Sequence, residues 1–459
     1  MERAGRAVAA AALRHFPGAL RFVVLCGPGN NGGDGYVAAR ALAESGASIA
    51  VYHLGDPEKL KGDAKQARDL CRLPSGRLER YQPVPGDVVI DALFGAGLAR
   101  AVPDVVAAAI RNVDDMKIPV LAVDLPSGLC GRRGVPLGAA FRASRTVTFM
   151  ARKPGHLLLP GRELCGHVEV FDIGIPARIV RSVAGKTREN APALWRDLLP
   201  EPGLDSHKYR RGHLVVFSGA AGKTGAARLS AMAGLKAGAG LVTIASPGDA
   251  MPVNASSLTA IMLHQVDVVG DLESWLQTAK LAAFVLGPGF GIGERARQFA
   301  LALKDRPLVL DADGITSFRD DPPDLFDAFA GDDTHLVLTP HEGEFSRLFP
   351  DLAADENLSK VEKAIKAAER AHAAIVYKGA DTVIASPDGR AHINANGPPW
   401  LATAGSGDVL AGMIGALLAQ GMPTFEAAAA GVYLHGAAAK QAGRGMTAED
   451  LAVHAGPGA

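Results

Sequence analysis

Apolar and polar positions in the first half of the chain follow a regular alternation of two patterns. Short, almost continuous apolar runs predict buried strands at Phe22–Cys26, Ser48–His53, Asp87–Ile90, Val120–Val123, Thr146–Phe149 and Val168–Asp172. Between these runs, apolar residues at helical spacing predict helices at Asp34–Glu44 and Asp104–Asn112. Buried strands that alternate with helices across glycine-rich turns are typical of an α/β fold with a doubly wound, mainly parallel sheet.

The second half restarts the same alternation. Its expected strands are Leu214–Phe217, Leu241–Ala245, Ala283–Leu286, Leu308–Leu310, Leu336–Leu338 and Ala374–Tyr377. Its expected helices are Ala226–Ala237, Arg295–Ala302, Val361–His372, Val409–Leu418 and Phe425–Gln441. No comparable strand is expected between Arg178 and Leu204, where prolines and charged residues gather. Because the two halves differ in motif order, we expect two different α/β domains, residues 1–185 and 206–459, joined by a linker at 186–205.

Composition narrows the class of protein. The 459 residues carry 48 Lys and Arg against 48 Asp and Glu, and this balance argues against a nucleic-acid-binding protein, which needs a basic surface. The sequence has no apolar run long enough to span a membrane, and the alanine-rich start, Met1–Leu13, does not predict a signal peptide. No CxxC pair or metal-ligand spacing occurs among the four cysteines, so we expect reduced thiols and a cytoplasmic protein; the cysteines are Cys26, Cys71, Cys130 and Cys165.

The stretch Leu401–Gly412 carries the strongest chemical signal. It runs from a turn of small residues into the apolar helix Val409–Leu418. Gly405 and Gly407 allow backbone N–H groups to converge at the positive end of that helix, which favours a bound anion. Asp408 can then accept a proton from a hydroxyl group that attacks a phosphate. Alternatively, Asp408 only caps the helix.

Other turns in the second half also follow strands. Gly287–Gly291, Asp311–Gly314, Thr339–Glu344 and Lys378–Thr382 each come directly after an apolar run. Lys378 can neutralise phosphate oxygens, although a solvated lysine is the commoner outcome. His341 is either a binding residue or a helix cap. The turn Gly219–Thr224 is not a Walker A loop, because Phe217 occupies the position of its first glycine.

In the first half, the turn Gly27–Gly35 follows a strand and contains GxGxxG, the fingerprint of dinucleotide-binding folds. Asp34 argues against an ordinary NAD dehydrogenase, because we expect it at the helix N-terminus, where it would repel a pyrophosphate. Asn30 and Asn31 favour a loop that binds a cation or donates hydrogen bonds. A plain glycine turn is the alternative.

Two further turns, Asp91–Leu98 and Asp124–Leu129, follow neighbouring strands of the same half. Ligands of open α/β sheets bind at the carboxyl ends of the strands, so these turns are expected to meet the first one. Their oxygen ligands favour an alkali or alkaline-earth cation over zinc. Helix capping is the alternative for each single aspartate. The residues expected to converge are Asn31, Asp91, Asp124 and Ser127.

Together with Lys153–Gly155 and Asp172–Pro176, these turns resemble the YjeF N-terminal family of NAD(P)HX epimerases, over Met1 to about Val180. The resemblance implies a Rossmann-like domain that epimerises hydrated nicotinamide cofactor at C6, with Asp124 as the acid/base that opens and recloses the hydrated ring. It also implies a potassium ion at Asn31, Asp91 and Ser127. The implied hydrate site comprises Asn30, Asn31, Gly32, Gly33, Asp34, Gly95, Ala96, Gly97, Leu98, Ala99, Arg100, Ala101 and Asp124. Family members usually carry a helix before the motif that here begins at Met1.

From about His207 onward, the chain resembles the ADP-dependent (S)-NAD(P)H-hydrate dehydratases, which have a ribokinase-like fold. The motifs that carry this resemblance are Gly212–Gly219, Lys236–Thr243, Gly287–Gly291, Thr339–Glu344, Lys378–Thr382 and Gly405–Gly412. The resemblance implies that ADP phosphorylates the C6 hydroxyl, with magnesium present and Asp408 as the base. The implied nucleotide site is Lys378, Gly379, Ala380, Asp381, Thr382, Gly405, Ser406 and Gly407, and the implied hydrate contacts are Ala226, Gly291, His341 and Asp408.

Two departures from the dehydratase pattern are visible. Ser406 stands where the family often has threonine, which keeps the hydroxyl, and the turn after Gly219 lacks the usual aromatic residue. The two resemblances together imply a bifunctional enzyme of NAD(P)H-hydrate repair that binds NAD(P)HX and ADP, with K⁺ and Mg²⁺, as a homo-oligomer. The alternative is a ribokinase-type small-molecule kinase whose first half is a binding domain without turnover. Potassium-dependent epimerisation would distinguish the two.

Overall fold

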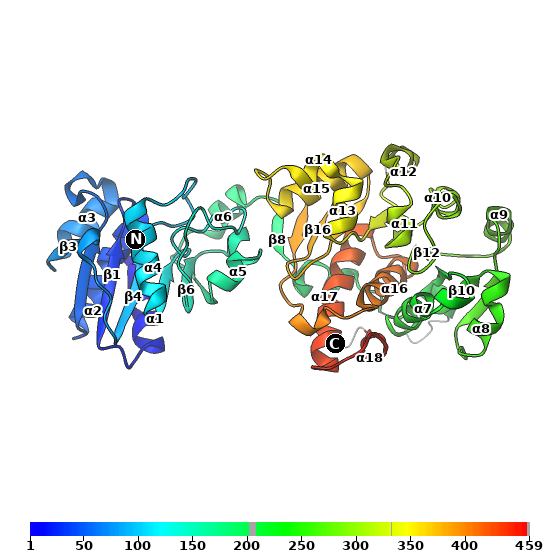
Figure 1. Ribbon diagram of the computed structural model, residues 1–459, viewed down its shortest axis with the longest axis horizontal. Helices are drawn as coiled ribbons and strands as arrows, with labels where there is room; N and C mark the ends of the chain where they lie inside the picture. Colours follow the sequence, from blue (N-terminus) through cyan, green and yellow to red (C-terminus); the bar gives the residue numbers. More distant parts are fainter. Residues whose placement is uncertain (202–207, 332, 457–459) are drawn as a thin grey trace. The chain divides into compact units, whose positions relative to one another are not determined.

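The chain folds into two compact units, Met1–Gly185 and Lys186–Ala459 (Figure 1). The computed structural model describes residues 1–201, 208–331 and 333–456. The end of the expected linker, residues 202–205, and His207 lie outside these described ranges. In the described part, no helix has both the length and the apolar character that crossing a membrane requires.

The first unit is built on one sheet with the strand order β3-β2-β1-β4-β5-β6-β7, in which all neighbouring strands are parallel. The strands are β1 (Arg21–Cys26), β2 (Ile49–His53), β3 (Ser75–Arg77), β4 (Asp87–Ala92), β5 (Val120–Val123), β6 (Arg145–Phe149) and β7 (His167–Phe171). The helices are α1 (Glu2–His15), α2 (Asn30–Glu44), α3 (Gly62–Leu70), α4 (Asp104–Asp115), α5 (Gly161–Leu164) and α6 (Ala177–Val183), with 3₁₀ turns at Pro57–Lys59, Leu78–Arg80 and Pro154–His156.

Helices cover both faces of this sheet, as the continuous apolar strands predict. Phe22 and Val24 of β1 pack in one core with α1 and α2, whereas Val23 and Leu25 pack in the opposite core with α4. A strand buried on both faces carries no alternation of apolar and polar residues, which explains the unbroken run in β1. The expected doubly wound sheet is therefore confirmed for this unit.

The second unit has a sheet with the strand order β11-β10-β9-β12-β13-β14-β15-β16-β17-β8. The strands are β8 (Thr187–Glu189), β9 (His213–Phe217), β10 (Leu241–Ser246), β11 (Met262–Gln265), β12 (Ala283–Leu286), β13 (Leu308–Leu310), β14 (Leu336–Leu338), β15 (Ala374–Tyr377), β16 (Val383–Ala385) and β17 (Ala391–Ile393). Among the strands that the structure describes in this sheet, only the pairs β15–β16 and β16–β17 are antiparallel.

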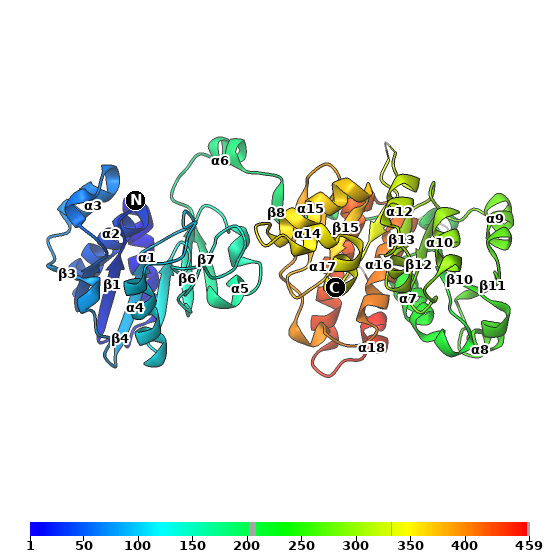
Figure 2. The same cartoon turned by 45° about the horizontal axis from the view of Figure 1, so that its top comes forward.

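The helices of this unit are α7 (Gly225–Lys236), α8 (Met251–Ala255), α9 (Val269–Thr278), α10 (Glu294–Leu301), α11 (Asp313–Thr316), α12 (Pro322–Ala328), α13 (Glu342–Leu348), α14 (Pro350–Ala354), α15 (Lys360–Ala371), α16 (Ser406–Ala419), α17 (Thr424–Ala442) and α18 (Ala448–Val453). Short 3₁₀ turns lie at Pro192–Leu194, Arg196–Leu198, Lys208–Arg211, Ala221–Lys223, Gly248–Ala250 and Pro399–Leu401. In both views α16 and α17 lie side by side against the sheet (Figures 1 and 2). The apolar α16 contributes most of its residues to one core of this unit.

The expectation that no strand lies between Arg178 and Leu204 is wrong. β8 (Thr187–Glu189) pairs with β17 at the edge of the second sheet. After it, Trp195 is buried and its indole N–H donates to Asn190 Oδ1 at 3.1 Å. The strand is three residues long and reads Thr-Arg-Glu, so it offers no apolar pattern to detect. This part of the expected linker belongs to the second unit.

Candidate active sites

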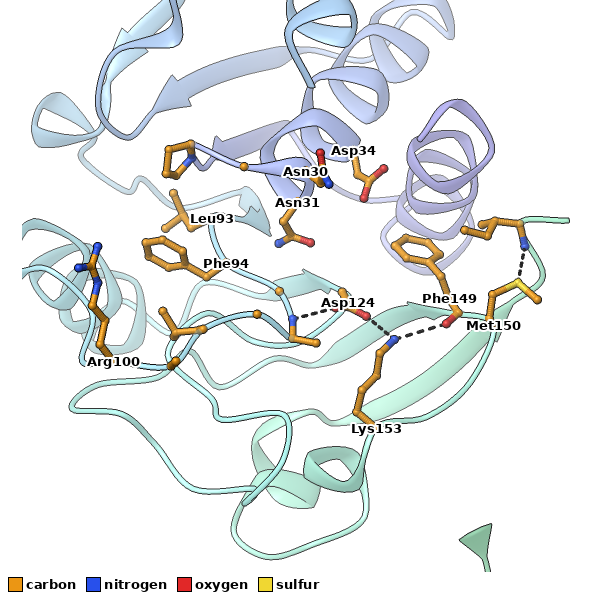
Figure 3. Close-up of a pocket in the computed structure, with 18 of the residues that line it drawn as sticks. Asn30, Asn31, Asp34, Leu93, Phe94, Arg100, Asp124, Phe149, Met150 and Lys153 are labelled. Atoms are coloured by element: carbon orange, nitrogen blue, oxygen red, sulfur yellow. Dashed lines mark hydrogen bonds and ion pairs between the residues drawn. The ribbon is translucent and has the colours of Figure 1, made fainter. Parts of the chain in front are cut away.

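A cavity of about 870 Å³ opens at the carboxyl ends of the first unit's strands (Figure 3). The turns after β1, β4, β5 and β6 all contribute to it, as the topology of a parallel sheet requires. Most of the expected hydrate-site residues line it, namely Asn30, Asn31, Asp34, Gly95, Ala96, Gly97, Leu98, Ala99, Arg100 and Asp124.

Gly32, Gly33 and Ala101 are not among the lining residues. The two glycines belong to the packing of α2 instead. A Cβ on Gly32 would lie 2.0 Å from the carbonyl oxygen of Gly27, and one on Gly33 would lie 2.9 Å from the Cα of Ala64. These glycines are needed for close backbone approach, which a sequence pattern cannot separate from ligand contact.

Asp124 stands at the centre of a hydrogen-bond network. Its Oδ1 accepts from Lys153 Nζ at 2.6 Å and from the Thr148 hydroxyl at 2.9 Å, and its Oδ2 accepts from the Ala96 N–H at 2.9 Å. Burial alone would raise the pKa of Asp124, but the charge of Lys153 and these hydrogen bonds hold it below its ordinary value. Asp124 is therefore ionised at neutral pH.

His156 fixes the backbone behind this carboxylate. Its Nδ1 accepts from the Lys153 N–H at 2.8 Å, so its Nε2 carries the proton and donates to the Asp124 carbonyl at 2.8 Å. Burial lowers the pKa of His156 to about 4, which keeps the ring neutral. Asp124 itself has a φ of +66°, a conformation uncommon outside glycine, and it is held there by this surrounding framework.

Asn31 and Asp124 approach each other at Gly95. A Cβ on Gly95 would lie 2.9 Å from Asp124 Oδ2 and 3.1 Å from Asn31 Oδ1. Only glycine leaves this space open. The structure thus brings together one residue from each of the three turns that follow β1, β4 and β5.

Asp91 and Ser127 form a buried pair below the cavity. Asp91 accepts from the Ser127 N–H and from the Ser127 hydroxyl, both at 2.6 Å, and burial raises its pKa to about 6. Asn31 Nδ2 is buried without a hydrogen-bond partner in the described part of the chain. An amide turned the other way would present an oxygen at that place, so the donor set is compatible with a hard cation.

Asp34 lies in the second turn of α2 and lines the cavity. The expectation that it occupies the helix N-terminus is wrong, because the helix begins at Asn30 and its first turn has no acidic residue. Burial raises the pKa of Asp34 to about 7, with a smaller lowering by the Met1 α-amino group and a smaller rise from Asp124. Across the described ranges, no donor hydrogen-bonds to its carboxyl group.

Several lining residues are absent from the sequence-based site. Lys153 is the most important, since it binds Asp124 directly. It follows β6, so the rule that led to the other turns would have found it. The remainder are mostly apolar and carry no chemical signal of their own: Pro28, Gly29, Leu93, Phe94, Phe149, Met150, Ile173 and Ile175.

In the second unit, consecutive strands β9, β12, β13, β14 and β15 end in the expected turns. Gly219, Gly287, Asp311, Thr339 and Lys378 lie within two residues of the carboxyl ends of these neighbouring parallel strands. They therefore meet along one edge of the sheet.

Lys378 is the charged centre of this edge. Its Nζ donates to Asp311 Oδ1 at 2.7 Å and lies 3.9 Å from Glu344 Oε2. Thr339 Oγ1 donates to the same Asp311 oxygen at 2.7 Å. Burial lowers the pKa of Lys378, but the charges of Asp311 and Glu344 outweigh it and raise the pKa overall. Lys378 is thus placed by buried partners and is not a solvated lysine.

The N-terminus of α16 joins this group. Gly405 precedes the helix with a φ of +84°, and a Cβ on Gly407 would lie 3.6 Å from Lys378 Nζ. The Ser230 hydroxyl donates to the Asp408 carbonyl at 2.7 Å, and the His435 ring bonds the Ser406 carbonyl at 2.8 Å. These two contacts fix the first turn of the helix.

Asp408 lies in that first turn but does not cap it, because no side-chain cap hydrogen bond is formed. In the described part of the chain, no donor hydrogen-bonds to its carboxylate. Burial, and then the negative charge of Asp311, raise the pKa of Asp408 to about 6, although Lys378 counteracts them. The capping alternative is therefore excluded, and the group has the basicity of a proton acceptor.

His341 does cap a helix, as its alternative interpretation stated. Its Nδ1 accepts from the Gly343 N–H at 2.9 Å at the start of α13, and Glu344 Oε2 accepts from the His341 N–H at 2.9 Å. Its ring remains exposed beside Glu344. Its Nε2 lies 3.3 Å from Glu344 Oε1, so both ring nitrogens have partners within α13.

The expected nucleotide turn Lys378–Thr382 is closed on itself. The Thr382 hydroxyl donates to the Gly379 carbonyl at 2.7 Å, and Asp381 binds Lys360 Nζ at 2.6 Å. Lys360, the first residue of α15, also stands 4.8 Å from the centre of the Tyr377 ring. Lys360 was not predicted, because it comes from a helix and not from a strand end.

The two small expected contacts, Ala226 and Gly291, flank the glycine turn after β12. A Cβ on Gly289 would lie 3.4 Å from the Ala226 Cβ, and the Gly291 N–H donates to Asp313 Oδ2 at 2.9 Å. Gly291 has a φ of +102° with open space beside it. Both residues leave room for a ligand near this turn.

Known proteins resemble each unit and the whole chain. Residues 1–155 match the family model described as YjeF-related protein N-terminus, and residues 214–455 match the model described as NAD(P)H-hydrate dehydratase. A bifunctional NAD(P)H-hydrate repair enzyme of Moorella thermoacetica is 38% identical, over 97% of this chain and 88% of its own length. The enzyme of that name from Escherichia coli is 34% identical, over 98% and 87%.

Solved structures resemble the second unit. An ADP/ATP-dependent NAD(P)H-hydrate dehydratase from Bacillus subtilis, co-crystallised with ATP and Mg²⁺, has a TM-score of 0.51 and 26% identity, and covers 59% of this chain and 97% of that one. A ribokinase-like superfamily protein from Enterococcus faecalis has a TM-score of 0.50 and 24% identity, with coverage of 59% and 94%. The fold of the second unit is ribokinase-like. From both domain models and the similarity along its whole length, the chain belongs to the family of bifunctional NAD(P)H-hydrate repair enzymes.

Proposed function

We propose that the first unit interconverts the R and S epimers of hydrated NAD(P)H, and that the second unit dehydrates the S epimer at the expense of ADP. The products are NAD(P)H, AMP and phosphate. The observation that carries this proposal is the position of Asp408. Its carboxylate lies in the first turn of α16, near Lys378, and makes no capping hydrogen bond. The similarity to repair enzymes along the whole chain supports the choice of substrate.

In the second unit, Asp408 takes the proton of the C6 hydroxyl while that oxygen attacks the β-phosphoryl group of ADP. The N–H groups at Gly405–Gly407 and the ammonium of Lys378 stabilise the charge that develops on the phosphate oxygens. Phosphate is a much better leaving group than hydroxide, so its elimination from C6 regenerates the reduced ring. Ala226, Gly291 and His341 contact the hydrate in this proposal.

The nucleotide is held by Lys378–Thr382 and by Gly405, Ser406 and Gly407 in this proposal. Magnesium, when bound, neutralises the phosphate charge. In the described part of the chain, no group of three or more His, Cys, Asp or Glu could hold a metal ion by itself. The ion would therefore enter with the nucleotide, held by its phosphates and one or two of the carboxylates, which is the usual arrangement for Mg²⁺.

In the first unit, the hydrate occupies the 870 Å³ cavity with its C6 hydroxyl at Asp124. Asn31, Asp91 and Ser127 would hold a potassium ion, which would supply positive charge to this site. The dehydratase consumes one epimer only, so an epimerase in the same chain lets both epimers be repaired.

The decisive test of the proposal is dehydration of chemically prepared NADH hydrate by the full chain with ADP and magnesium. The absorbance of the NADH that forms measures the rate. Asp408→Asn should lower kcat by about 10²–10⁴-fold, because the base is lost. Glu449→Gln, an exposed change on α18, should leave the rate unchanged. Since the pKa of Asp408 is about 6, the wild-type rate should fall as the pH decreases through 6.

An Asp408→Asn variant as fast as the wild type would contradict the assignment of the base. Epimerisation is measured separately, starting from the pure R epimer. Its rate should fall when sodium or lithium replaces potassium. Potassium-independent epimerisation would remove the cation from the proposal.

A further inference from the structure

Two carboxyl groups line the first unit's cavity, and their surroundings are opposite. Asp34 comes from α2, whereas Asp124 comes from the end of β5 on the other side of the cavity with Lys153 (Figure 3). Two carboxyl groups in contrasting environments within one pocket can divide the roles of proton donor and proton acceptor. This argument rests on the proposed epimerisation.

Asp124 cannot be the donor of the first step. Its two oxygens accept hydrogen bonds from Lys153, Thr148 and the Ala96 N–H, all of which stabilise the ionised form. With those donors in place, the carboxylate holds no proton at neutral pH. It can accept one from a hydroxyl group placed beside it.

Asp34 is the complementary group. It is half-buried on the wall of the same cavity, and within the described ranges no hydrogen-bond donor pairs with its side chain. The charged groups that face it are the α-amino group of Met1 ahead of α1 and Asp124 after β5, which itself is bound to Lys153. Burial without a partner favours its protonated form, and its pKa of about 7 agrees with this.

We propose that Asp34 is the proton donor of the epimerisation and that Asp124 is the acceptor. In the forward step Asp124 takes the proton of the C6 hydroxyl, the electron pair of that O–H bond forms the C6=O bond, and the C6–N1 bond breaks. Asp34 protonates N1, which keeps the pair of the broken bond. After rotation about C5–C6, N1 attacks the other face of the aldehyde, Asp34 regains its proton from N1, and Asp124 returns its proton to the oxygen.

The weak basicity of Asp124 suits this division. As C6–N1 breaks, the hydroxyl becomes that of a protonated aldehyde, which is a far stronger acid than a carboxylic acid. A poorly basic carboxylate therefore suffices as the acceptor. Breaking the bond to nitrogen, in contrast, requires a group that holds its proton near neutral pH, and Asp34 is the carboxyl group of the cavity that does.

The test is epimerisation of the pure R epimer by the full chain, with potassium present, as a function of pH. Asp34→Asn should lower kcat by about 10²–10⁴-fold while the KM changes much less, and Asp34→Glu should restore part of the rate. The wild-type rate should fall as the pH rises through about 7, because the donor ionises, and Asp34→Asn should lose this dependence. Asp114→Asn, an exposed change on α4, is the matched control.

Three outcomes separate this inference from the proposed function. If the wild type does not interconvert the epimers, the proposed function of the first unit fails and this inference with it. If the wild type does so and Asp34→Asn keeps its rate or its pH profile, only the division of roles is overturned. If Asp34→Asn raises KM and leaves kcat unchanged, Asp34 is a binding residue and the inference is likewise overturned.

Folding of the variant is checked by a second measurement. An Asp with a folded-state pKa of about 7 and an ordinary pKa when unfolded loses stability as the pH rises from about 4 to 7, because the unfolded chain ionises first. Asp34→Asn should remove that loss and protect the first unit at alkaline pH. Hydrogen exchange of α2 in the full chain measures it. If the Asp34→Asn variant has a more stable first unit and yet loses epimerase activity, the loss comes from the reaction and not from unfolding.

Discussion

At the scale of single residues, the first site depends on one glycine that keeps two polar oxygens apart. Gly95 has Asp124 Oδ2 and Asn31 Oδ1 within 3.1 Å of where a Cβ would stand. The Asp124 side chain is held by its hydrogen bonds, and the backbone of Asn31 lies in the first turn of α2. A methyl group cannot be accommodated there without moving one of them.

Gly95→Ala should therefore lower epimerisation by at least about tenfold, while the unfolding free energy of the first unit changes by less than about 1–2 kcal/mol, since the added methyl group faces a cavity and not the core. Epimerisation of the R epimer and hydrogen exchange of the first unit measure the two effects. Gly18→Ala, which meets nothing within 4 Å, is the control. Full epimerase activity in Gly95→Ala would show that Asp124 and Asn31 can separate without cost.

The same scale shows what a sequence can and cannot tell about a site. Asp124 and Asn31 were predicted because polar residues after strands meet at one sheet edge, and Lys153 would follow from that rule. Gly32 and Gly33 lie in the same motif as Asn31. A Cβ atom on either glycine would nevertheless point toward Gly27 or Ala64 and not into the cavity. Which side of a helix a motif residue faces depends on where the helix begins, and α2 begins four residues before the predicted start.

At the scale of elements, the second site is supported by the close packing of α16 on α7. A Cβ on Gly412 of α16 would lie 2.0 Å from the Ser230 carbonyl oxygen of α7. One turn earlier, the Ser230 hydroxyl donates to the Asp408 carbonyl. The spacing between these two helices thus fixes both the core and the N-terminal turn that carries Asp408.

Gly412→Ala should destabilise the second unit by about 1–3 kcal/mol, because the backbone of α7 must move away. The variant should also lower the rate of dehydration by more than its fraction of unfolded protein accounts for, because the Asp408 carbonyl and the Ser230 hydroxyl move apart. All three tryptophans, Trp195, Trp275 and Trp400, lie in this unit, so tryptophan fluorescence during urea unfolding reports on it alone. Gly270→Ala, in α9 with open space around it, should stabilise slightly. Unchanged stability in Gly412→Ala would contradict the close packing.

Most apolar strands were predictable, including the three-residue strands β13 and β14, whereas five short strands were not. β1, β4 and β9 are buried on both faces, so each contains a continuous apolar run, namely Phe22–Cys26, Val88–Ile90 and Leu214–Phe217. β3, β8, β11, β16 and β17 have three or four residues each, and the first three are largely polar or exposed. Their pairing is decided by neighbours distant in the sequence, as when β8 pairs with β17 about 200 residues later.

At the scale of the whole chain, each unit has its own sheet and its own cores, and the boundary between them falls at Gly185 and Lys186. The sequence-based prediction ended the first domain at residue 185 and began the second at residue 206, with a linker at 186–205 between them. Within that interval Asn190 donates to the Ala429 carbonyl of α17 at 2.8 Å, and Trp195 is only 3% exposed. These contacts tie the segment to the second unit and make it part of that unit's core.

Two fragments of the chain distinguish these boundaries. Residues 186–459 should unfold with nearly the same urea midpoint as the second unit of the full chain and should dehydrate the S epimer. Residues 206–459 lack β8, Asn190 and Trp195, and should be less stable by at least about 3–5 kcal/mol, the usual effect of removing one buried tryptophan side chain. Fluorescence of Trp275 and Trp400 follows both transitions. Equal midpoints would contradict this prediction and would mean that the segment 186–205 only covers the edge of the sheet. The buried strand β17 would then be stable as an exposed edge strand, which is rare for a short strand.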